Sequence, residues 1–226
     1  MHIEPLGDSA VVAVLGSRIE ASTLASVLRL ARAVAAAKGR GIVDVVPAYA
    51  TLTVFYDPAQ FAEPAYDSVC RFVESCASRA APAGPEPAPA TVEIPVCYGG
   101  ELGPDLGYVA EHCGRSAAEV SALHAGADYL VHAIGFVPGF PYLGGLPDAL
   151  RTPRLDSPRT RVPAGSVGIG GAQTGVYPIE APGGWRIIGR TPFALFRPDR
   201  APAALLRAGD RVRFRAISAR EFESWR

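Results

Sequence analysis

Two stretches rich in glycine, proline and aromatic residues are the parts of the sequence best suited to chemistry: residues 135–147 (GFVPGFPYLGGLP) and residues 162–178 (VPAGSVGIGGAQTGVYP). A rigid loop of this composition lets the backbone approach a ligand closely while aromatic rings form the walls of the site. In the first stretch we expect Phe136, Phe140 and Tyr142 to contact a substrate. By composition alone, β-barrel corners whose glycines only supply unusual backbone angles are the simpler interpretation.

Four arginines lie between or beside these stretches, each close to a proline that restricts the local backbone. A guanidinium group held in this way suits a carboxylate or a phosphate, because its planar fork donates two parallel hydrogen bonds. The alternative is a solvated arginine loop that pairs with Asp148, with Asp156 or with nothing. The four arginines are Arg151, Arg154, Arg159 and Arg161.

Gln173, Thr174 and Tyr177 place an amide, a hydroxyl and a phenol within one turn of the second stretch. Such a set can hold a small polar amide or carboxylate by direct hydrogen bonds, or it can satisfy the backbone of its own loop. We expect Arg159, Gln173 and Tyr177 to act in catalysis, and Arg154, Arg161 and Thr174 to bind substrate together with the three aromatic residues named above.

No complete catalytic set is present in the sequence. The single lysine, Lys38, is not part of a P-loop motif, and Ser166 lacks the glycine two residues earlier that a nucleophile elbow uses. Without a second lysine there is also no serine-serine-lysine amidase arrangement. The four cysteines lack C-x-x-C spacing and the histidines lack H-E-x-x-H spacing, so neither a metal site nor a biotin site is evident. The chain is therefore expected to be inactive alone.

The first 79 residues predict a small α/β sandwich domain. Helical spacing of apolar residues indicates a helix over 19–38, and a second helical stretch follows Asp57. Short runs rich in β-branched residues predict strands at 11–15, 42–46 and 52–56.

A proline-alternating tract over residues 80–90 predicts a linker, because such a sequence favours extended geometry over a packed element. Residues 91–226 then predict a second domain, a mostly β barrel with helical pieces near 106–112 and 117–124. Its apolar runs, cut by glycine and proline, are 91–96, 129–134, 167–169, 175–179, 185–188, 193–196 and 211–216.

Composition narrows the classes of partner. The 22 basic residues balance 22 acidic ones, which gives no electrostatic basis for binding nucleic acid or an anionic membrane. No stretch approaches the roughly 20 apolar residues that span a bilayer, and no signal peptide is evident at Met1–Pro5, so we expect a cytoplasmic location.

Four motifs in a fixed order carry a resemblance to a known family. They are GFVPGFPYLGGLP at 135–147, PRLDSPR at 153–159, VPAGSVGIGGAQTGVYP at 162–178 and PGGWRIIGRT at 182–191. The chain resembles, over essentially its whole length, the family of the 5-oxoprolinase B subunit and the Kip inhibitor, also labelled allophanate hydrolase subunit 1. One departure is Leu155, where many relatives have a second arginine.

The resemblance implies an α+β protein whose C-terminal domain is a cyclophilin-like β barrel. It implies a non-autonomous subunit of ATP-dependent 5-oxoprolinase, which shares ATP with a larger homologous subunit (the 5-oxoprolinase C subunit, allophanate hydrolase subunit 2-like) and with a third subunit. It also leaves two alternatives: a regulatory module that inhibits a sensor histidine kinase, and a carboxyltransferase-type subunit acting on urea or allophanate. Prolyl isomerase activity would rest on the fold analogy only.

Overall fold

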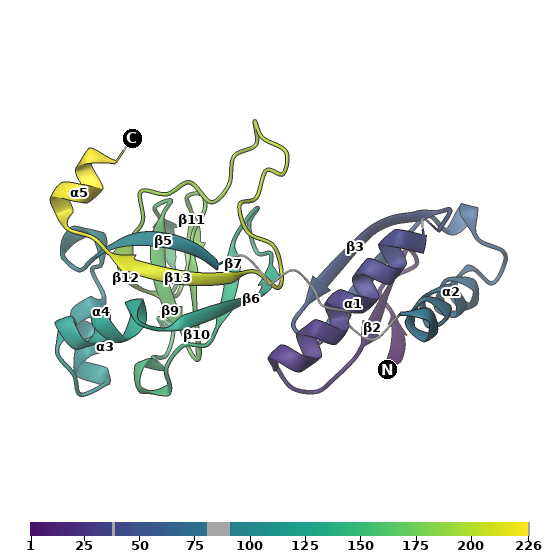
Figure 1. Ribbon diagram of the computed structural model, residues 1–226, viewed down its shortest axis with the longest axis horizontal. Coiled ribbons are helices and arrows are strands. Elements are labelled where there is room, and N and C mark those ends of the chain that lie inside the picture. The colour runs from purple at the N-terminus through teal and green to yellow at the C-terminus, as the bar shows by residue number, and fades with distance from the viewer. Residues whose placement is uncertain (38, 81–90, 226) are drawn as a thin grey trace. The chain divides into compact units, whose positions relative to one another are not determined.

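The chain divides into two compact units in the computed structural model, an N-terminal unit of residues 1–88 and a C-terminal unit of residues 89–226 (Figure 1). The structure describes residues 1–37, 39–80 and 91–225. The predicted linker over 80–90 lies outside the described residues, apart from Ala80.

The N-terminal unit is built on an antiparallel sheet of four strands in the order β1-β2-β4-β3. The sequence did not predict β1, which pairs with β2 from His2 opposite Val14 to Pro5 opposite Val11. The strands are β1 (His2–Pro5), β2 (Ala10–Val14), β3 (Ile42–Ala48) and β4 (Thr51–Tyr56).

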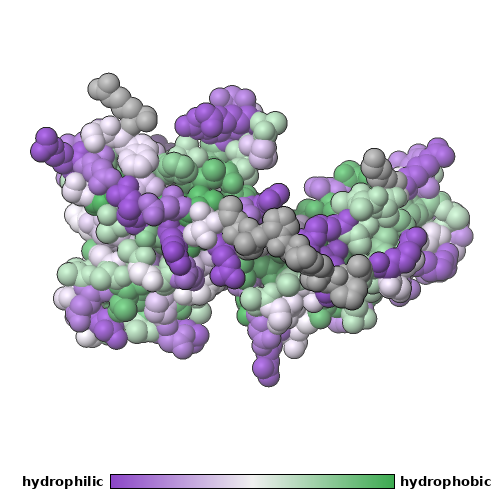
Figure 2. All heavy atoms as spheres, in the orientation of Figure 1, coloured by the Kyte–Doolittle hydropathy of each residue, from purple (hydrophilic) through white to green (hydrophobic). Residues whose placement is uncertain are grey.

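Two helices, α1 (Ala21–Ala37) and α2 (Ala65–Arg79), cover one face of this sheet, as Figure 1 shows. Leu24, Val27, Leu30 and Val34 form the buried stripe of α1, at the three- and four-residue spacing expected of a helix that packs on a sheet. Figure 2 shows further hydrophobic side chains on the outer surface over α1, where exposed alanines lie. A two-layer α/β sandwich results.

The C-terminal unit is a closed barrel of seven strands in the order β10-β7-β6-β13-β5-β12-β9. Strands β5 and β13 are parallel, whereas the other neighbouring strands are antiparallel. A separate pair, β8 (Arg159–Val162) and β11 (Ala181–Gly183), lies outside the barrel ladder. The barrel strands are β5 (Thr91–Tyr98), β6 (Asp128–Ile134), β7 (Pro141–Gly144), β9 (Ser166–Gly170), β10 (Gln173–Val176), β12 (Arg186–Arg190) and β13 (Arg211–Ala216).

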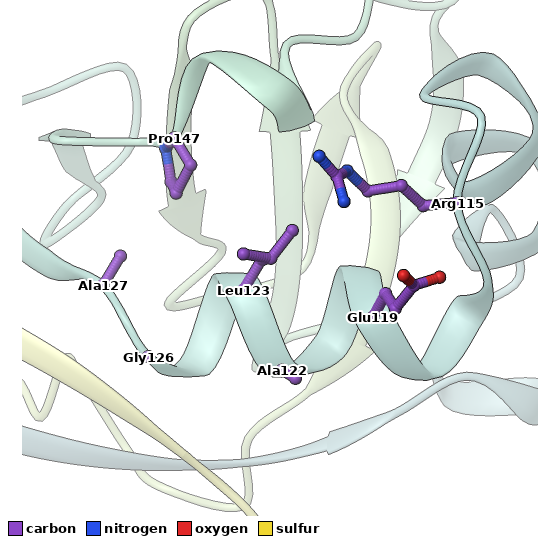
Figure 3. Close-up of a pocket in the computed structure, with 7 residues that line it drawn as sticks. All are labelled: Arg115, Glu119, Ala122, Leu123, Gly126, Ala127 and Pro147. Carbon is purple, nitrogen blue, oxygen red and sulfur yellow. The ribbon is translucent and has the colours of Figure 1, made fainter.

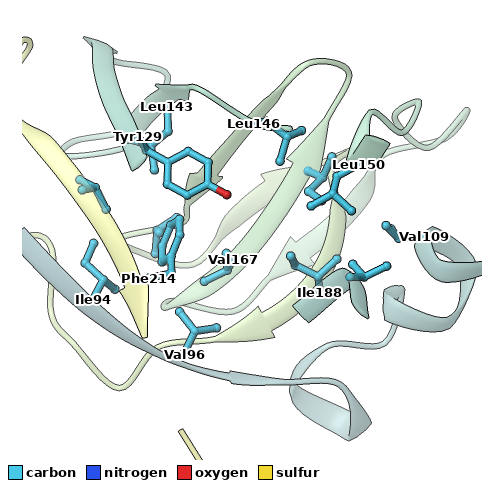
Figure 4. Close-up of a cluster of buried hydrophobic side chains, with 14 of the residues drawn as sticks. Ile94, Val96, Val109, Tyr129, Leu143, Leu146, Leu150, Val167, Ile188 and Phe214 are labelled. Carbon is cyan, nitrogen blue, oxygen red and sulfur yellow. The ribbon is translucent and has the colours of Figure 1, made fainter. Parts of the chain in front are cut away.

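The barrel encloses the largest of the three hydrophobic clusters formed by the described residues (Figure 4). Val167 and Ile169 of β9 point into it, and Tyr129 and Phe214 pack edge to face with 5.2 Å between ring centroids. Because side chains alternate along a strand, Ser166, Gly168 and Gly170 face the outer side of β9. A second, smaller cluster lies on that outer side.

Three helices complete the C-terminal unit: α3 (Leu106–His112), α4 (Ala117–Ala125) and α5 (Ala219–Ser224). A capping box between Ser116 and Glu119 begins α4. The prediction of an α+β protein with a C-terminal barrel is confirmed. Within the described residues no helix is both long and apolar enough to cross a membrane.

The strand predicted over 193–196 is wrong, because the described chain there forms only an isolated bridge between Phe196 and Ala204. The run predicted over 175–179 is also displaced, since β10 ends at Val176. Tyr177 is consequently the first residue beyond the barrel ladder.

Candidate functional site

An aromatic pocket on the outer side of the barrel brings together most of the predicted substrate-binding residues. Its cavity volume is about 350 Å³. Phe136 and Phe140 come from the loop before β7, Tyr142 from β7 itself, and Tyr177 from the end of β10. The lining residues are Phe136, Phe140, Tyr142, Arg154, Leu155, Pro158, Tyr177, Pro182, Gly183, Gly184 and Trp185.

Phe140 is the centre of this pocket's wall. Its ring meets those of Tyr142, Tyr177 and Trp185 edge to face, with centroid separations of 5.0, 5.1 and 5.4 Å. Edge-to-face pairs of this kind add about 0.5–1.5 kcal/mol each beyond their burial, so the wall is rigid. Phe140 itself is buried.

Phe136 differs from the other rings because it lies at the mouth of the pocket. Its side chain is 59% exposed and its backbone has a φ of 69°, a conformation that is rare outside glycine. Backbone strain of this kind persists only where the surrounding structure imposes it, and it concentrates at ligand-binding sites. The exposed Phe136 ring still packs edge to face on Phe140, at 5.7 Å.

Glycines make room for the rings. A methyl group added at Gly170 would come within 2.6 Å of the Trp185 indole, and one added at Gly175 would come within 2.9 Å of the Phe140 ring. A methyl group at Gly183 would overlap the Tyr177 hydroxyl. These three glycines therefore bring the backbone as close to the aromatic wall as the packing allows.

Arg154 supplies the positive charge of the pocket. Its guanidinium carbon lies 5.6 Å from the centre of the Trp185 ring. Within the described part of the chain no carboxylate pairs with it. The charge is thus available to an anionic ligand, since aromatic walls leave it without a protein counter-ion.

Tyr177 is buried beside this charge. Burial raises the pKa of its phenol, although a hydrogen bond with the Trp185 backbone and the charge of Arg154 act in the opposite direction. The phenol therefore stays protonated at neutral pH and can donate a hydrogen bond into the pocket.

The other predicted arginines already have carboxylate partners. Arg159 of β8 donates to Asp105 over 2.7 Å, and Arg161 makes a bidentate pair with Glu180 at 2.9 and 3.0 Å. Arg151 pairs with Asp148 at 2.8 Å, as the alternative interpretation of the arginine loop anticipated. The structure thus separates Arg154 from the other three arginines.

Thr174 lies inside the barrel instead of in the pocket. Its hydroxyl donates to the Gly168 carbonyl at 2.9 Å, so it accepts from the Nε2–H of His124, also at 2.9 Å. The Nδ1 of His124 then accepts from the Tyr98 hydroxyl at 2.8 Å. This buried chain fixes the tautomer of His124, and desolvation lowers the His124 pKa to about 3.

Gln173 begins β10 opposite Gly170 and is partly exposed. Gln173 is not among the residues that line the pocket.

The sequence analysis assigned no role to Trp185, which closes the pocket next to Gly183 and Gly184. The motif PGGW could have indicated that Trp185 lines a pocket, because two glycines before a large aromatic residue allow the backbone to pass close to its ring.

A second hollow of about 540 Å³ lies against α4 (Figure 3). Leu123 projects into it between Arg115 and Pro147. Its one acidic residue, Glu119, is engaged in capping the helix: hydrogen bonds from the backbone and hydroxyl of Ser116 hold the Glu119 pKa below its usual range. None of the predicted site residues lines this hollow, which is larger but chemically less suited to a substrate.

No group of three or more potential metal ligands occurs among the described residues. The geometry describes a binding pocket with a rigid aromatic wall, one available guanidinium and one phenol. It contains no nucleophile with an adjacent base.

The sequence profile of the carboxyltransferase domain, subdomain C and D, matches residues 1–206, and the chain belongs to this family. It is 45% identical to the B subunit of 5-oxoprolinase from Bacillus subtilis, over the whole chain and 96% of that protein. It is 44% identical to the B subunit of 5-oxoprolinase from Escherichia coli O157:H7, over 92% of this chain and 93% of that one. The family prediction is confirmed.

Two solved structures have a fold similar to that of this chain. The protein TTHA0988 is 38% identical, with a TM-score of 0.79, and the match covers 93% of this chain. This chain spans only 40% of TTHA0988. The urea amidolyase of Kluyveromyces lactis is 17% identical with a TM-score of 0.78, over 98% of this chain and 15% of that protein, which shows a shared fold alone.

Proposed function

We propose that this chain is the B subunit of a 5-oxoprolinase, the enzyme that opens 5-oxoproline to glutamate with ATP and water. The observation that carries the proposal is its end-to-end similarity to the 5-oxoprolinase B subunits of two bacteria. This agrees with the expectation drawn from the four sequence motifs. Because the chain has no nucleophile-base pair in its pocket, its part in the reaction is to bind and orient, with ATP shared between subunits.

The aromatic pocket is the proposed site for 5-oxoproline. The substrate has a small lactam ring with one carboxylate, and the pocket offers a ring-stacking wall around Phe140 next to the unpaired guanidinium of Arg154. Arg154 would hold the carboxylate by charge-assisted hydrogen bonds. Tyr177 would donate a hydrogen bond to the lactam carbonyl, whose oxygen gains negative charge as the amide is activated.

Arg159 takes a positioning role in this proposal. Its Nη2 holds Asp105 and its Nη1 lies 3.5 Å from the Trp185 carbonyl oxygen, so it fixes one wall of the pocket. Arg161 and Gln173 do not line the pocket, and they would contact a partner protein or the incoming substrate. Thr174 would support the pocket from inside the barrel through Gly168, because its hydroxyl donates to the Gly168 carbonyl and Gly168 packs against Trp185.

The proposed partners are a larger homologous subunit and a third subunit. The relatives carry the name of one lettered subunit of 5-oxoprolinase, which supports the existence of others. The length of TTHA0988 supports it too, since a single chain there carries a match to this one within a longer polypeptide.

The deciding experiment measures 5-oxoproline-dependent ATP hydrolysis by this chain alone, by the larger homologous partner alone and by all three subunits together. Activity only in the full mixture is the expected result. If none of the mixtures hydrolyses ATP, the assignment is refuted. That result would favour carboxyltransferase activity on urea, an alternative suggested by the fold that the chain shares with the urea amidolyase.

A binding module that controls a histidine kinase is the second candidate. The observation in its favour is Phe136, a strained and exposed aromatic residue at the mouth of an apolar pocket. Exposed aromatic anchors are typical of protein-binding grooves. Unchanged autophosphorylation of sensor kinases in the presence of the chain, with no kinase recovered by affinity capture, would exclude it.

A further inference from the structure

A row of polar side chains crosses the outer side of the barrel next to the aromatic pocket. Tyr177 donates its backbone N–H to Ser166, and the register then places Arg190 opposite Ser166 and Cys97 opposite Arg190. Neighbours of this kind have Cβ atoms about 4.5–5.5 Å apart. The row therefore leads from the wall of the pocket across four adjacent segments of chain.

Two polar atoms in this row are buried without a partner. Among the described residues, neither the Ser166 hydroxyl nor the Nε of Arg190 has a hydrogen bond, and Ser166 is 0% exposed. A buried polar atom without a partner costs about 1–3 kcal/mol, and a pair of adjacent ones calls for an explanation. A ligand that accepts from both atoms would supply one.

The backbone is shaped to hold Arg190 in this place. Gly165 has a φ of +80°, and an added methyl group there would overlap the Thr191 carbonyl oxygen and come within 3.2 Å of the Arg190 Cγ. The Arg190 side chain thus runs along the Gly165 turn toward Ser166. Arg190 as a whole is partly exposed although its Nε is buried, so part of this residue is open to solvent beside the unpartnered atoms.

We propose that Ser166 and Arg190 form an oxyanion subsite beside the aromatic pocket, for a phosphate group. A tetrahedral oxyanion accepts from a guanidinium fork and from a hydroxyl at the same time. The choice of phosphate over carboxylate rests on the proposed function, because ATP-driven ring opening brings a phosphoryl group to the substrate. The subsite belongs to segments 162–178 and 182–191, whose serine and final arginine the proposed lactam pocket leaves unused.

The test is a titration of the full ¹⁵N-labelled chain with inorganic phosphate at constant ionic strength, with parallel titrations of acetate and ADP. Saturable shifts at the amides of residues 165, 166 and 190 are expected, with Arg190→Gln weakening phosphate binding about tenfold or more. Ser166→Ala is expected to weaken it severalfold without loss of thermal stability. Arg211→Gln, which removes an exposed charge from β13, is the control and should leave the affinity unchanged.

Tighter binding of ADP than of phosphate would assign the subsite to a nucleotide phosphate, and equal binding would assign it to phosphate itself. Absence of saturation, or equal affinity in the wild type and Arg190→Gln, would overturn the proposal and leave a bridging water as the occupant. Stronger binding of acetate than of phosphate would also overturn it. None of these results depends on turnover, so they are independent of whether the assembled subunits hydrolyse 5-oxoproline.

Discussion

Arg159 and Asp105 lie 54 residues apart in the sequence and are joined by a hydrogen-bonded ion pair of 2.7 Å. The second carboxylate oxygen of Asp105 accepts from the backbone N–H of Ile187 at 2.6 Å. One buried carboxylate therefore connects β8, the start of α3 and β12. Because Trp185 lies two residues before Ile187, this connection also fixes the wall of the aromatic pocket.

Removal of Arg159 is expected to lower stability. Arg159→Ala leaves the carboxylate of Asp105, whose side chain is 10% exposed, without its counter-charge, and should lower the free energy of unfolding by about 1–3 kcal/mol. Chemical denaturation measures the change. Arg161→Ala, which breaks an exposed ion pair with Glu180, is the matched control and should cost less than about 1 kcal/mol.

A positioning role for Arg159 also predicts how activity responds. In the reconstituted complex Arg159→Lys should retain more turnover than Arg159→Ala, since a lysine can still pair with Asp105. If Arg159→Ala were as stable and as active as the wild type, neither the positioning role nor the expected catalytic role would survive.

Arg154 is expected to act on substrate binding without affecting stability. Arg154→Gln removes the one pocket charge that lacks a carboxylate partner among the described residues, and should raise the KM for 5-oxoproline about 10- to 100-fold. The thermal midpoint should stay within about one degree. Arg151→Gln provides the control, because Arg151 is exposed and pairs with Asp148 at the surface. An equal effect of both variants would contradict the assignment.

The sequence predicted α3 and α4 of the C-terminal unit well, but it missed α5 and the shortest strands. The predicted helical piece over 106–112 coincides with α3, since its apolar residues repeat at helical spacing. The strands β7, β8 and β11, with four, four and three residues, were missed. Each is too short to show alternation, and tertiary pairing rather than local propensity makes it a strand.

The sequence predicted those parts of the candidate site that are close together along the chain, but not those that depend on long-range contacts. Phe136, Phe140 and Tyr142 are close in sequence, so one loop brings them together. The sequence could not distinguish Arg154 from Arg159, because the partner that occupies Arg159 lies 54 residues earlier. Which arginine is free for a ligand is decided by long-range packing alone.

The glycine at 183 is expected to be essential to the pocket. Gly183→Ala places a methyl group against the buried Tyr177 hydroxyl and should disturb the aromatic wall, with a loss of about 1–3 kcal/mol in stability and of substrate binding. Gly107→Ala is the matched control: it lies in α3 with nothing within 4 Å of the added methyl, and should be neutral or stabilising by up to about 1 kcal/mol. Thermal unfolding of both variants and titration with 5-oxoproline give the comparison, and an undisturbed Gly183→Ala protein would show that the ring can move aside.

The buried His124 makes the C-terminal unit sensitive to acid. Its pKa is about 3 in the folded chain against 6.5 for an exposed histidine, because burial disfavours the charged form. Between these two values the unfolded chain binds one more proton than the folded chain, so stability falls as the pH drops through this range, by about 1.4 kcal/mol per pH unit for this residue. Burial also lowers the pKa of His132, which adds to the effect in the same direction.

This pH dependence can be assigned to His124 by substitution. His124→Gln offers a donor and an acceptor to Thr174 and Tyr98 but does not titrate, so the slope of the unfolding free energy between pH 6.5 and pH 4.5 should decrease by about one proton. Both tryptophans, Trp185 and Trp225, belong to the C-terminal unit, so their fluorescence reports its unfolding separately. An unchanged slope in His124→Gln would mean that other groups carry the acid sensitivity and that His124 is protonated without cost in the folded barrel.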